Sequence, residues 1–138
     1  MDANSALRRG VVMVVDDDEI VLEVVRERLE ARGYTVILRQ NSLGTRAALM
    51  LECPEILLLD VNMPALHGKV LARLVSEIPI EMRPGIILHS ADETGMAEEI
   101  AAASGALGLI RKTSTRQAFL SQFERLVGTM RSTLSAAG

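Results

Sequence analysis

One stretch constrains the fold of this chain more than any other. Four consecutive apolar residues, 56–59, end at Asp60, and the stretch is bounded by Pro54 and Pro64. An unbroken apolar run of this length is typical of a strand covered on both faces. Such a strand predicts a parallel sheet with helices on both sides, in which ligands bind just beyond the carboxyl ends of the strands. Asp60 is expected at one of those ends, where a carboxylate is either a reactive group or a simple turn cap.

The rest of the sequence alternates between strand and helix patterns. Strand patterns occur at 11–15, 34–38, 56–60, 85–90 and 107–110. Each is followed by a helical pattern, at 20–32, 42–52, 69–77, 94–104 and 115–133. This alternation predicts an α/β fold with a doubly wound, five-stranded parallel sheet and helices on both faces. We expect the flavodoxin-like strand order 2-1-3-4-5, in which the carboxyl ends of the first and third strands are neighbours.

Length and composition narrow the class of protein. We expect one domain over 10–133, with short flexible tails at 1–9 and 134–138. The net charge of −3 argues against a direct nucleic-acid partner, because phosphate binding needs a basic face. A single cysteine, Cys53, excludes an internal disulfide. No stretch has the length and apolarity of a membrane span or a secretion signal, so we expect a cytoplasmic protein without membrane contact.

Polar residues stand where four of the predicted strands end. Asp16 and Asp17 follow the first strand, Asp60 ends the third, Ser90 ends the fourth and Lys112 follows the fifth. Three neighbouring carboxylates repel one another unless a cation offsets their charge, and Mg²⁺ prefers such oxygen ligands. A carboxylate can also accept a phosphoryl group, whose oxygens would then be bound by Mg²⁺, by an ammonium and by a hydroxyl. The sequence contains each of these groups.

In order and spacing, these residues resemble the receiver domain of two-component response regulators. The resemblance covers about residues 11–130 and includes single-domain receivers similar to chemotaxis regulators. It rests on Val-Val-Asp-Asp at 14–17, Leu-Leu-Asp-Val-Asn-Met-Pro at 58–64, Gly68, Ser90-Ala91 and Lys112.

The resemblance implies a phosphorylation-dependent signalling switch. Asp60 would accept a phosphoryl group from a sensor histidine kinase or a phosphotransfer protein, assisted by Ser90 and Lys112. A Mg²⁺ cofactor would be held by Asp16, Asp17, Asp60 and the backbone carbonyl of Asn62. A downstream protein would contact the face formed by the fourth helix, the fifth strand and the fifth helix. Such a chain is not an enzyme beyond its own phosphotransfer and autodephosphorylation.

Two positions depart from the family pattern. Leu109 stands where the family usually has an aromatic residue, which swings inward when the hydroxyl residue engages the phosphoryl group. Thr113 stands where the family usually has a proline after a cis peptide bond. A cis bond before a non-proline residue is costly, so we expect a trans bond between Lys112 and Thr113. His89, within the fourth strand, is expected to be a packed, neutral imidazole.

Two other functions stay open at this stage. The chain could be a pseudo-receiver scaffold that takes no phosphate, which Leu109 and Thr113 favour and the intact acids, Ser90 and Lys112 oppose. It could also be a Mg²⁺-dependent phosphohydrolase with an aspartate nucleophile. Such enzymes usually carry a second acid two residues after the nucleophile, where this chain has Asn62.

Overall fold

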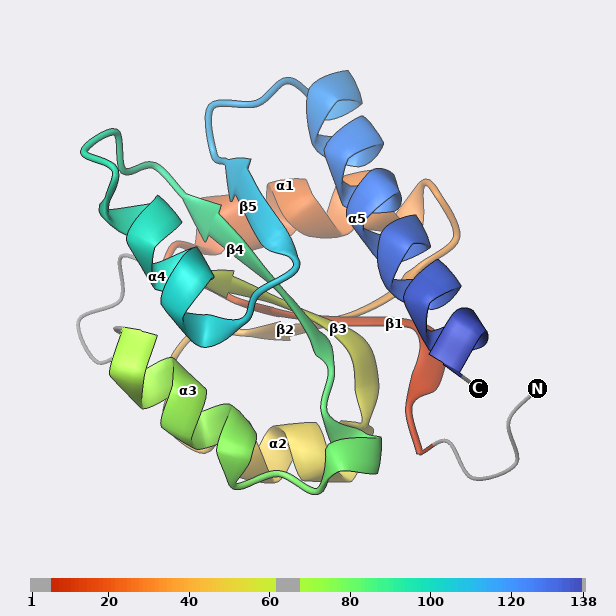
Figure 1. The fold of residues 1–138 in the computed structure, drawn as a ribbon. Helices are drawn as coiled ribbons and strands as arrows, with labels where there is room; N and C mark the ends of the chain where they lie inside the picture. Colours follow the sequence, from red (N-terminus) through yellow and green to blue (C-terminus); the bar gives the residue numbers. More distant parts are fainter. Residues whose placement is uncertain (1–5, 62–67, 138) are drawn as a thin grey trace.

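The computed structural model describes residues 6–61 and 68–137. In this part of the chain, parallel pairing joins five strands: β1 (Arg8–Val15), β2 (Thr35–Arg39), β3 (Pro54–Asp60), β4 (Gly85–Ser90) and β5 (Gly108–Arg111). The helices described are α1 (Glu19–Glu30), α2 (Thr45–Glu52), α3 (Gly68–Ser76), the short 3-10 helix η1 (Ile80–Met82), α4 (Met96–Ser104) and α5 (Arg116–Ala137). The strand order is β2-β1-β3-β4-β5, which confirms the predicted fold (Figure 1).

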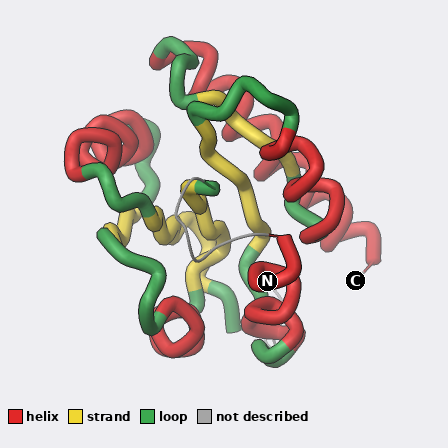
Figure 2. The backbone as a smooth tube through the Cα atoms, turned by 90° about the vertical axis from the view of Figure 1, so that its left-hand side faces the viewer, coloured by secondary structure: helices red, strands yellow, loops and turns green. Residues whose placement is uncertain are grey.

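The sheet lies between two layers of helices. Figure 1 shows α1 and α5 on one side of the sheet and α2, α3 and α4 on the other, and Figure 2 shows the strands between them. All seven residues of β3 are buried. Because successive side chains of a strand point to opposite faces, Ile56 and Leu58 pack with α1 and α5, whereas Leu57 and Leu59 pack on the other side. The continuous apolar run before Asp60 therefore contributes side chains to the hydrophobic cores on both faces of the sheet.

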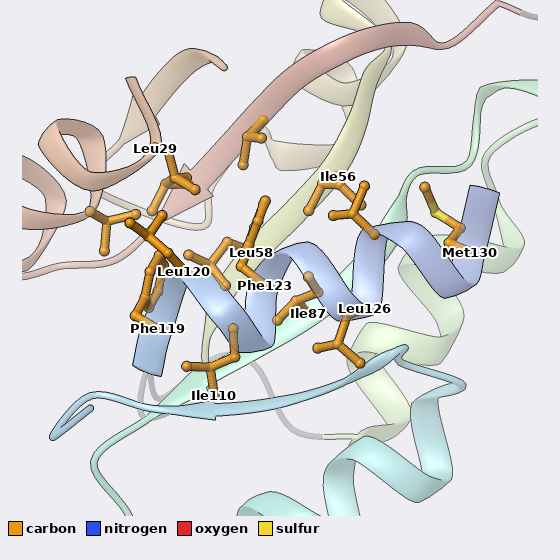
Figure 3. Packing of buried hydrophobic residues seen from close by; sticks show 14 of the residues in the cluster. Leu29, Ile56, Leu58, Ile87, Ile110, Phe119, Leu120, Phe123, Leu126 and Met130 are labelled. Atoms are coloured by element: carbon orange, nitrogen blue, oxygen red, sulfur yellow. The ribbon is translucent and has the colours of Figure 1, made fainter. Parts of the chain in front are cut away.

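The larger core lies beneath α5. Figure 3 shows side chains of α5 beside those of β3, β4 and β5: Phe119, Phe123 and Leu126 against Ile56, Leu58, Ile87 and Ile110. Phe119 and Phe123 stack with ring centroids 6.0 Å apart, and Tyr34 meets the Phe123 ring edge-on at 5.3 Å. The aromatic residues of this aliphatic chain are thus concentrated on one side of the sheet, where aromatic pairs add to the free energy of burial.

Both terminal elements extend beyond the predicted domain limits of 10–133. Strand β1 begins at Arg8, whose amide donates to the carbonyl of Cys53 at 2.8 Å. Helix α5 continues to Ala137, because no glycine or proline interrupts the chain between Gly128 and the C-terminal residue. Part of the predicted C-terminal tail is therefore helical. Among the described helices, none has the length and apolarity needed to cross a membrane.

Two helices begin later than predicted, because polar side chains form turns before them. Helix α2 begins at Thr45 and not at Ser42, whose carbonyl accepts hydrogen bonds from the Thr45 amide at 3.2 Å and hydroxyl at 2.6 Å. Helix α4 begins at Met96 and not at Thr94, whose amide and hydroxyl donate to the carboxylate of Asp92 at 3.1 and 2.7 Å. Local hydrogen bonds of this kind compete with helix formation.

A buried carboxylate closes the amino-terminal end of β3. The Nε and Nη2 atoms of Arg131, on α5, lie 2.8 and 2.7 Å from the two carboxylate oxygens of Glu55. The amide of Gly10, in β1, donates to Oε1 of Glu55 at 2.9 Å. Burial alone would raise the pKa of Glu55, but the hydrogen bonds from Arg131 and Gly10 outweigh it and hold this pKa below its usual value. This carboxylate therefore joins α5 to two strands.

We predict that Glu55→Gln destabilises the protein by about 1–3 kcal/mol at neutral pH, because it weakens hydrogen bonds to a charged group. The loss should shrink as the pH falls. A lowered folded-state pKa means that the Glu55 contribution is complete above the unfolded pKa of about 4.3 and disappears as the pH drops through the folded value. Urea unfolding at a series of pH values from 7 to 3 measures the stability difference between wild type and variant. Glu52→Gln is the control, because it removes a carboxylate from the exposed pair with Arg8, where a smaller loss is expected. A pH-independent difference would contradict the prediction.

A second prediction concerns Gly85, at the start of β4. A Cβ atom there would collide with Sδ of Met130 and lie 2.8 Å from Cδ1 of Leu107. We expect Gly85→Ala to lower the free energy of unfolding by about 1–3 kcal/mol through overpacking. Gly128→Ala is the control, because a Cβ in that exposed helical position meets nothing within 4 Å, and it should stabilise the protein by about 0.5–1 kcal/mol. Equal urea midpoints for Gly85→Ala and Gly128→Ala would contradict this prediction, because they would mean that the core around Gly85 rearranges to accommodate the added methyl group.

Candidate functional site

The candidate site lies at the carboxyl edge of the sheet, where four strand ends converge. The pairs Val15–Leu59 and Asp60–His89 are in register, so β1, β3 and β4 end at the same level. Asp16 directly follows β1, Asp60 is the last residue of β3 and Ser90 is the last residue of β4. The amide of Lys112, just after β5, donates to the carbonyl of Ser90 at 2.8 Å. Backbone pairing alone therefore brings these predicted site residues together.

Three carboxylates form a compact acidic cluster. Asp16, Asp17 and Asp60 each offer an oxygen atom, and these oxygens lie within 4.8 Å of one another. The side chains of Asp16 and Asp60 are buried, whereas Asp17 is exposed. The donors are all carboxylate oxygens, and one of them faces solvent, so the cluster fits a hard cation that keeps part of its water shell. Asn62, predicted to add a backbone carbonyl, lies outside the described residues.

Asp18, which follows Asp17 in the sequence, has a structural role outside the acidic cluster. Asp18 is the N-cap of α1, and its side chain accepts a hydrogen bond from the amide of Ile20 at 2.9 Å. Its own amide donates to Oδ1 of Asp16 at 2.9 Å. The start of α1 thus orients the buried Asp16, while the Asp18 carboxylate satisfies the helix terminus.

Lys112 places an ammonium group between the two buried acids. Its Nζ atom lies 2.9 Å from Oδ2 of Asp16 and 3.2 Å from Oδ1 of Asp60, and its side chain is 15% exposed. Burial by itself would lower the pKa of Lys112, but the hydrogen bond to Asp16 and the charge of Asp60 raise it overall. The lysine is therefore charged at neutral pH. Its charge lies between the two buried acids, with Asp17 beside them.

Ser90 is fully buried at the end of β4. Its Oγ atom accepts a hydrogen bond from the amide of Asp92 at 2.9 Å. A serine hydroxyl has one proton to donate and two lone pairs, so this bond occupies an acceptor position and leaves the proton for another group. The carboxylate of Asp92 accepts from Thr94 and, at 3.3 Å, from the amide of Ala97. Hydrogen bonds from Thr94 lower the pKa of Asp92.

The positions that depart from the family pattern are also resolved. Leu109 is partly buried and packs in the core on the α4 side of the sheet. No cis peptide bond occurs among the described residues, so the bond between Lys112 and Thr113 is trans, as predicted. His89 is buried, with its ring 5.6 Å from that of Phe119. Burial, then the charges of Lys112 and Arg28, lower the pKa of His89 to about 3, which confirms a neutral imidazole.

One residue of this region was not foreseen from the sequence. The Arg111 guanidinium binds both the backbone carbonyl of Asp92 and the carboxylate of Glu98 on α4. An arginine that ends a short strand gives no periodic or motif signal, and it is indistinguishable in sequence from a solvated surface charge. Only the turn formed by Asp92 and Thr94 brings its acceptors within reach.

Comparisons with known proteins identify the family of the chain. The family model of the response regulator receiver domain matches residues 12–124. The DNA-binding transcriptional regulator NtrC of Salmonella typhimurium is 34% identical over 71 residues, which cover 51% of this chain and 15% of NtrC. The protein-glutamate methylesterase/protein-glutamine glutaminase 3 of Rhodospirillum rubrum is 32% identical over 104 residues, covering 73% of this chain and 27% of that protein. The chain thus spans about a quarter or less of these relatives.

Among solved structures, the response regulator signal receiver domain from Bermanella marisrubri has the same fold. Its TM-score is 0.76 at 24% sequence identity, and the match covers 87% of this chain and 99% of that one. The family model covers most of the chain, and the acidic cluster and Lys112 lie together at the edge where the predicted strand ends meet. This chain therefore belongs to the response regulator receiver domain family.

Proposed function

We propose that this receiver domain is a phosphorylation-dependent switch in which Asp60 accepts the phosphoryl group. The observation that carries the proposal is the ammonium of Lys112 between Asp60 and Asp16, at the edge where Ser90 also ends its strand. If Lys112 only stabilised the fold through an ion pair, one carboxylate beside it would be enough. Here three carboxylates, a lysine and a buried hydroxyl gather at the edge where ligands bind in sheets of this topology.

The chemistry follows from the positions of these side chains. A carboxylate oxygen of Asp60 attacks the phosphorus atom of the donor, the bond to the leaving group breaks, and an acyl phosphate forms. The ammonium of Lys112 has three N–H donors, so it can hold one phosphoryl oxygen without leaving its carboxylate partners entirely. The Ser90 hydroxyl, fixed on its acceptor side by Asp92, can donate its proton to a second oxygen.

The proposed cofactor is Mg²⁺, held by Asp16, Asp17 and Asp60 and, by family resemblance, by the backbone carbonyl of Asn62. When bound, Mg²⁺ supplies charge neutralisation for the oxygens of the transferred group. Asp17 is exposed, so at least one of the proposed ligands is accessible from solvent. The closeness of the three carboxylate oxygens, within 4.8 Å of one another, supports this assignment, because carboxylate oxygens are ligands that Mg²⁺ prefers.

The partners we propose are proteins. A sensor histidine kinase or a phosphotransfer protein would supply the phosphoryl group, and a downstream protein would contact the face formed by α4, β5 and α5. We propose a cytoplasmic location, no direct contact with nucleic acid and no catalysis beyond the domain's own phosphotransfer and autodephosphorylation. The domain is proposed to cover about residues 10–133, with the helical extension of α5 beyond it.

The first test is intact-mass measurement after incubation with Mg²⁺ and acetyl phosphate. We expect one phosphoryl addition in the wild type and none in Asp60→Asn, because an amide is a poor nucleophile. Asp18→Asn is the matched control and should be phosphorylated like the wild type, since asparagine caps helices as well as aspartate does. A wild type that gains no mass and binds no beryllofluoride would instead support the pseudo-receiver scaffold.

The metal assignment has a separate test. We predict that Asp17→Asn weakens Mg²⁺ binding by about tenfold or more, equivalent to about 1.4 kcal/mol, because it removes one carboxylate from the cluster. Calorimetric titration with Mg²⁺ measures the affinity, and Asp18→Asn again serves as the neighbouring acid outside the cluster. Equal losses in the two variants would mean that only the general negative charge of this edge attracts the ion.

A further inference from the structure

Arg111 joins the end of β5 to the loop that precedes α4. It lies next to Lys112 in sequence, but its side chain binds the carbonyl of Asp92 and the carboxylate of Glu98. The side chains of Arg111 and Glu98 are 39% and 48% exposed, so their charge attraction alone contributes little in water. What distinguishes this contact is the second acceptor, the backbone carbonyl of Asp92.

The same residue, Asp92, also holds the Ser90 hydroxyl. Its amide donates to Oγ of Ser90 at 2.9 Å, and its carbonyl accepts from Arg111. A continuous set of hydrogen bonds therefore runs from Glu98 through Arg111 and Asp92 to the buried Ser90. Asp92 stands two residues after the end of β4, outside any regular element, and its backbone amide and carbonyl are bound by Ser90 and Arg111.

We infer that Arg111 is a positioning residue for the Ser90 hydroxyl in phosphoryl binding, an inference that rests on the function proposed above. Arg111 holds the carbonyl of Asp92 and so restrains the backbone of that residue, the Asp92 amide fixes the acceptor side of Oγ, and the hydroxyl proton is left to point toward a phosphoryl oxygen. A hydroxyl rotor held in this way loses less freedom when it binds its ligand than a free one. Arg111 need not touch the phosphoryl group to affect its binding.

The choice of arginine is consistent with this role. Its planar guanidinium presents several donors in a fixed arrangement and can bind a carbonyl and a carboxylate at once, whereas a lysine ammonium acts as a single point charge. Because Glu98 lies on α4, the Ser90 hydroxyl is also linked to that helix. The link does not depend on Leu109, which lacks the aromatic ring that the family usually has at that position.

The experiment combines two measurements on Arg111→Gln, Ser90→Ala and the double variant. The first is hydrogen exchange of the Asp92 amide, observed by NMR without any phosphoryl group. Both single variants should reduce the protection of this amide, and the double variant should exchange no faster than Ser90→Ala. The second is beryllofluoride affinity in the presence of Mg²⁺. Arg111→Gln should weaken it by about tenfold, the lower end of the losses caused by removing outer partners of a binding site.

Conservative and matched variants separate positioning from general destabilisation. Arg111→Lys should recover part of the affinity, because it can still reach one acceptor. Arg116→Gln is the matched control, since Arg116 forms an exposed ion pair with Glu27 at 2.9 Å that has no link to Ser90. It should leave both the Asp92 amide and beryllofluoride binding unchanged. In the Ser90→Ala background, Arg111→Gln should have no further effect on affinity.

Two results would overturn the inference. One is unchanged protection of the Asp92 amide in Arg111→Gln, and the other is an equal loss of affinity whether or not Ser90 is present. If the wild type binds no beryllofluoride, the proposed function fails by itself. The exchange data then test only the hydrogen-bond linkage from Arg111 through Asp92 to Ser90. Reduced protection of the Asp92 amide in both single variants supports this linkage, and unchanged protection refutes it.

Discussion

The ammonium of Lys112 between Asp16 and Asp60 is the interaction on which this edge of the sheet depends. Two buried carboxylates at adjacent strand ends would be strongly unfavourable without a cation. Lys112 reaches both from the far side, because β4 separates β5 from β3 and the Lys112 amide is held by the Ser90 carbonyl. The position of the lysine is thus set by sheet pairing, and the acids can be buried only because that pairing forms.

The two faces of the sheet contribute differently to the site. The α1–α5 side contains the aromatic residues and the neutral imidazole of His89, and it buries side chains of β1 and β3. The α2–α4 side is aliphatic and includes Leu109. The loop between β4 and α4 belongs to neither core and is organised by polar contacts around Asp92. Apolar packing therefore fixes the strands that carry the acids, while hydrogen bonds around Asp92 fix the orientation of the Ser90 hydroxyl.

Much of this arrangement could be predicted from the sequence, for a definable reason. Apolar runs that end in polar residues identify strands and their carboxyl ends, and the parallel topology then brings Asp16, Asp60 and Ser90 together without knowledge of any side-chain contact. The predicted starts of α2 and α4 are wrong, because Ser42 and Asp92 form turns that helical periodicity does not reveal. Arg111 was missed for a related reason, since its partners depend on the shape of one of these turns.

Strand β3 carries a buried carboxylate at each end, and the two differ in how their charge is balanced. Glu55 meets one guanidinium in a two-point contact and an amide, all from within the chain. Asp60 shares the ammonium of Lys112 with Asp16 and lies beside Asp17. The charge of Glu55 thus faces a guanidinium from another element, whereas the charge of Asp60 stands among other acids that surround the same ammonium. The fold thus has a built-in polarity: one pole of the sheet gathers acids from two strand ends around a lysine, and the opposite pole serves to anchor α5.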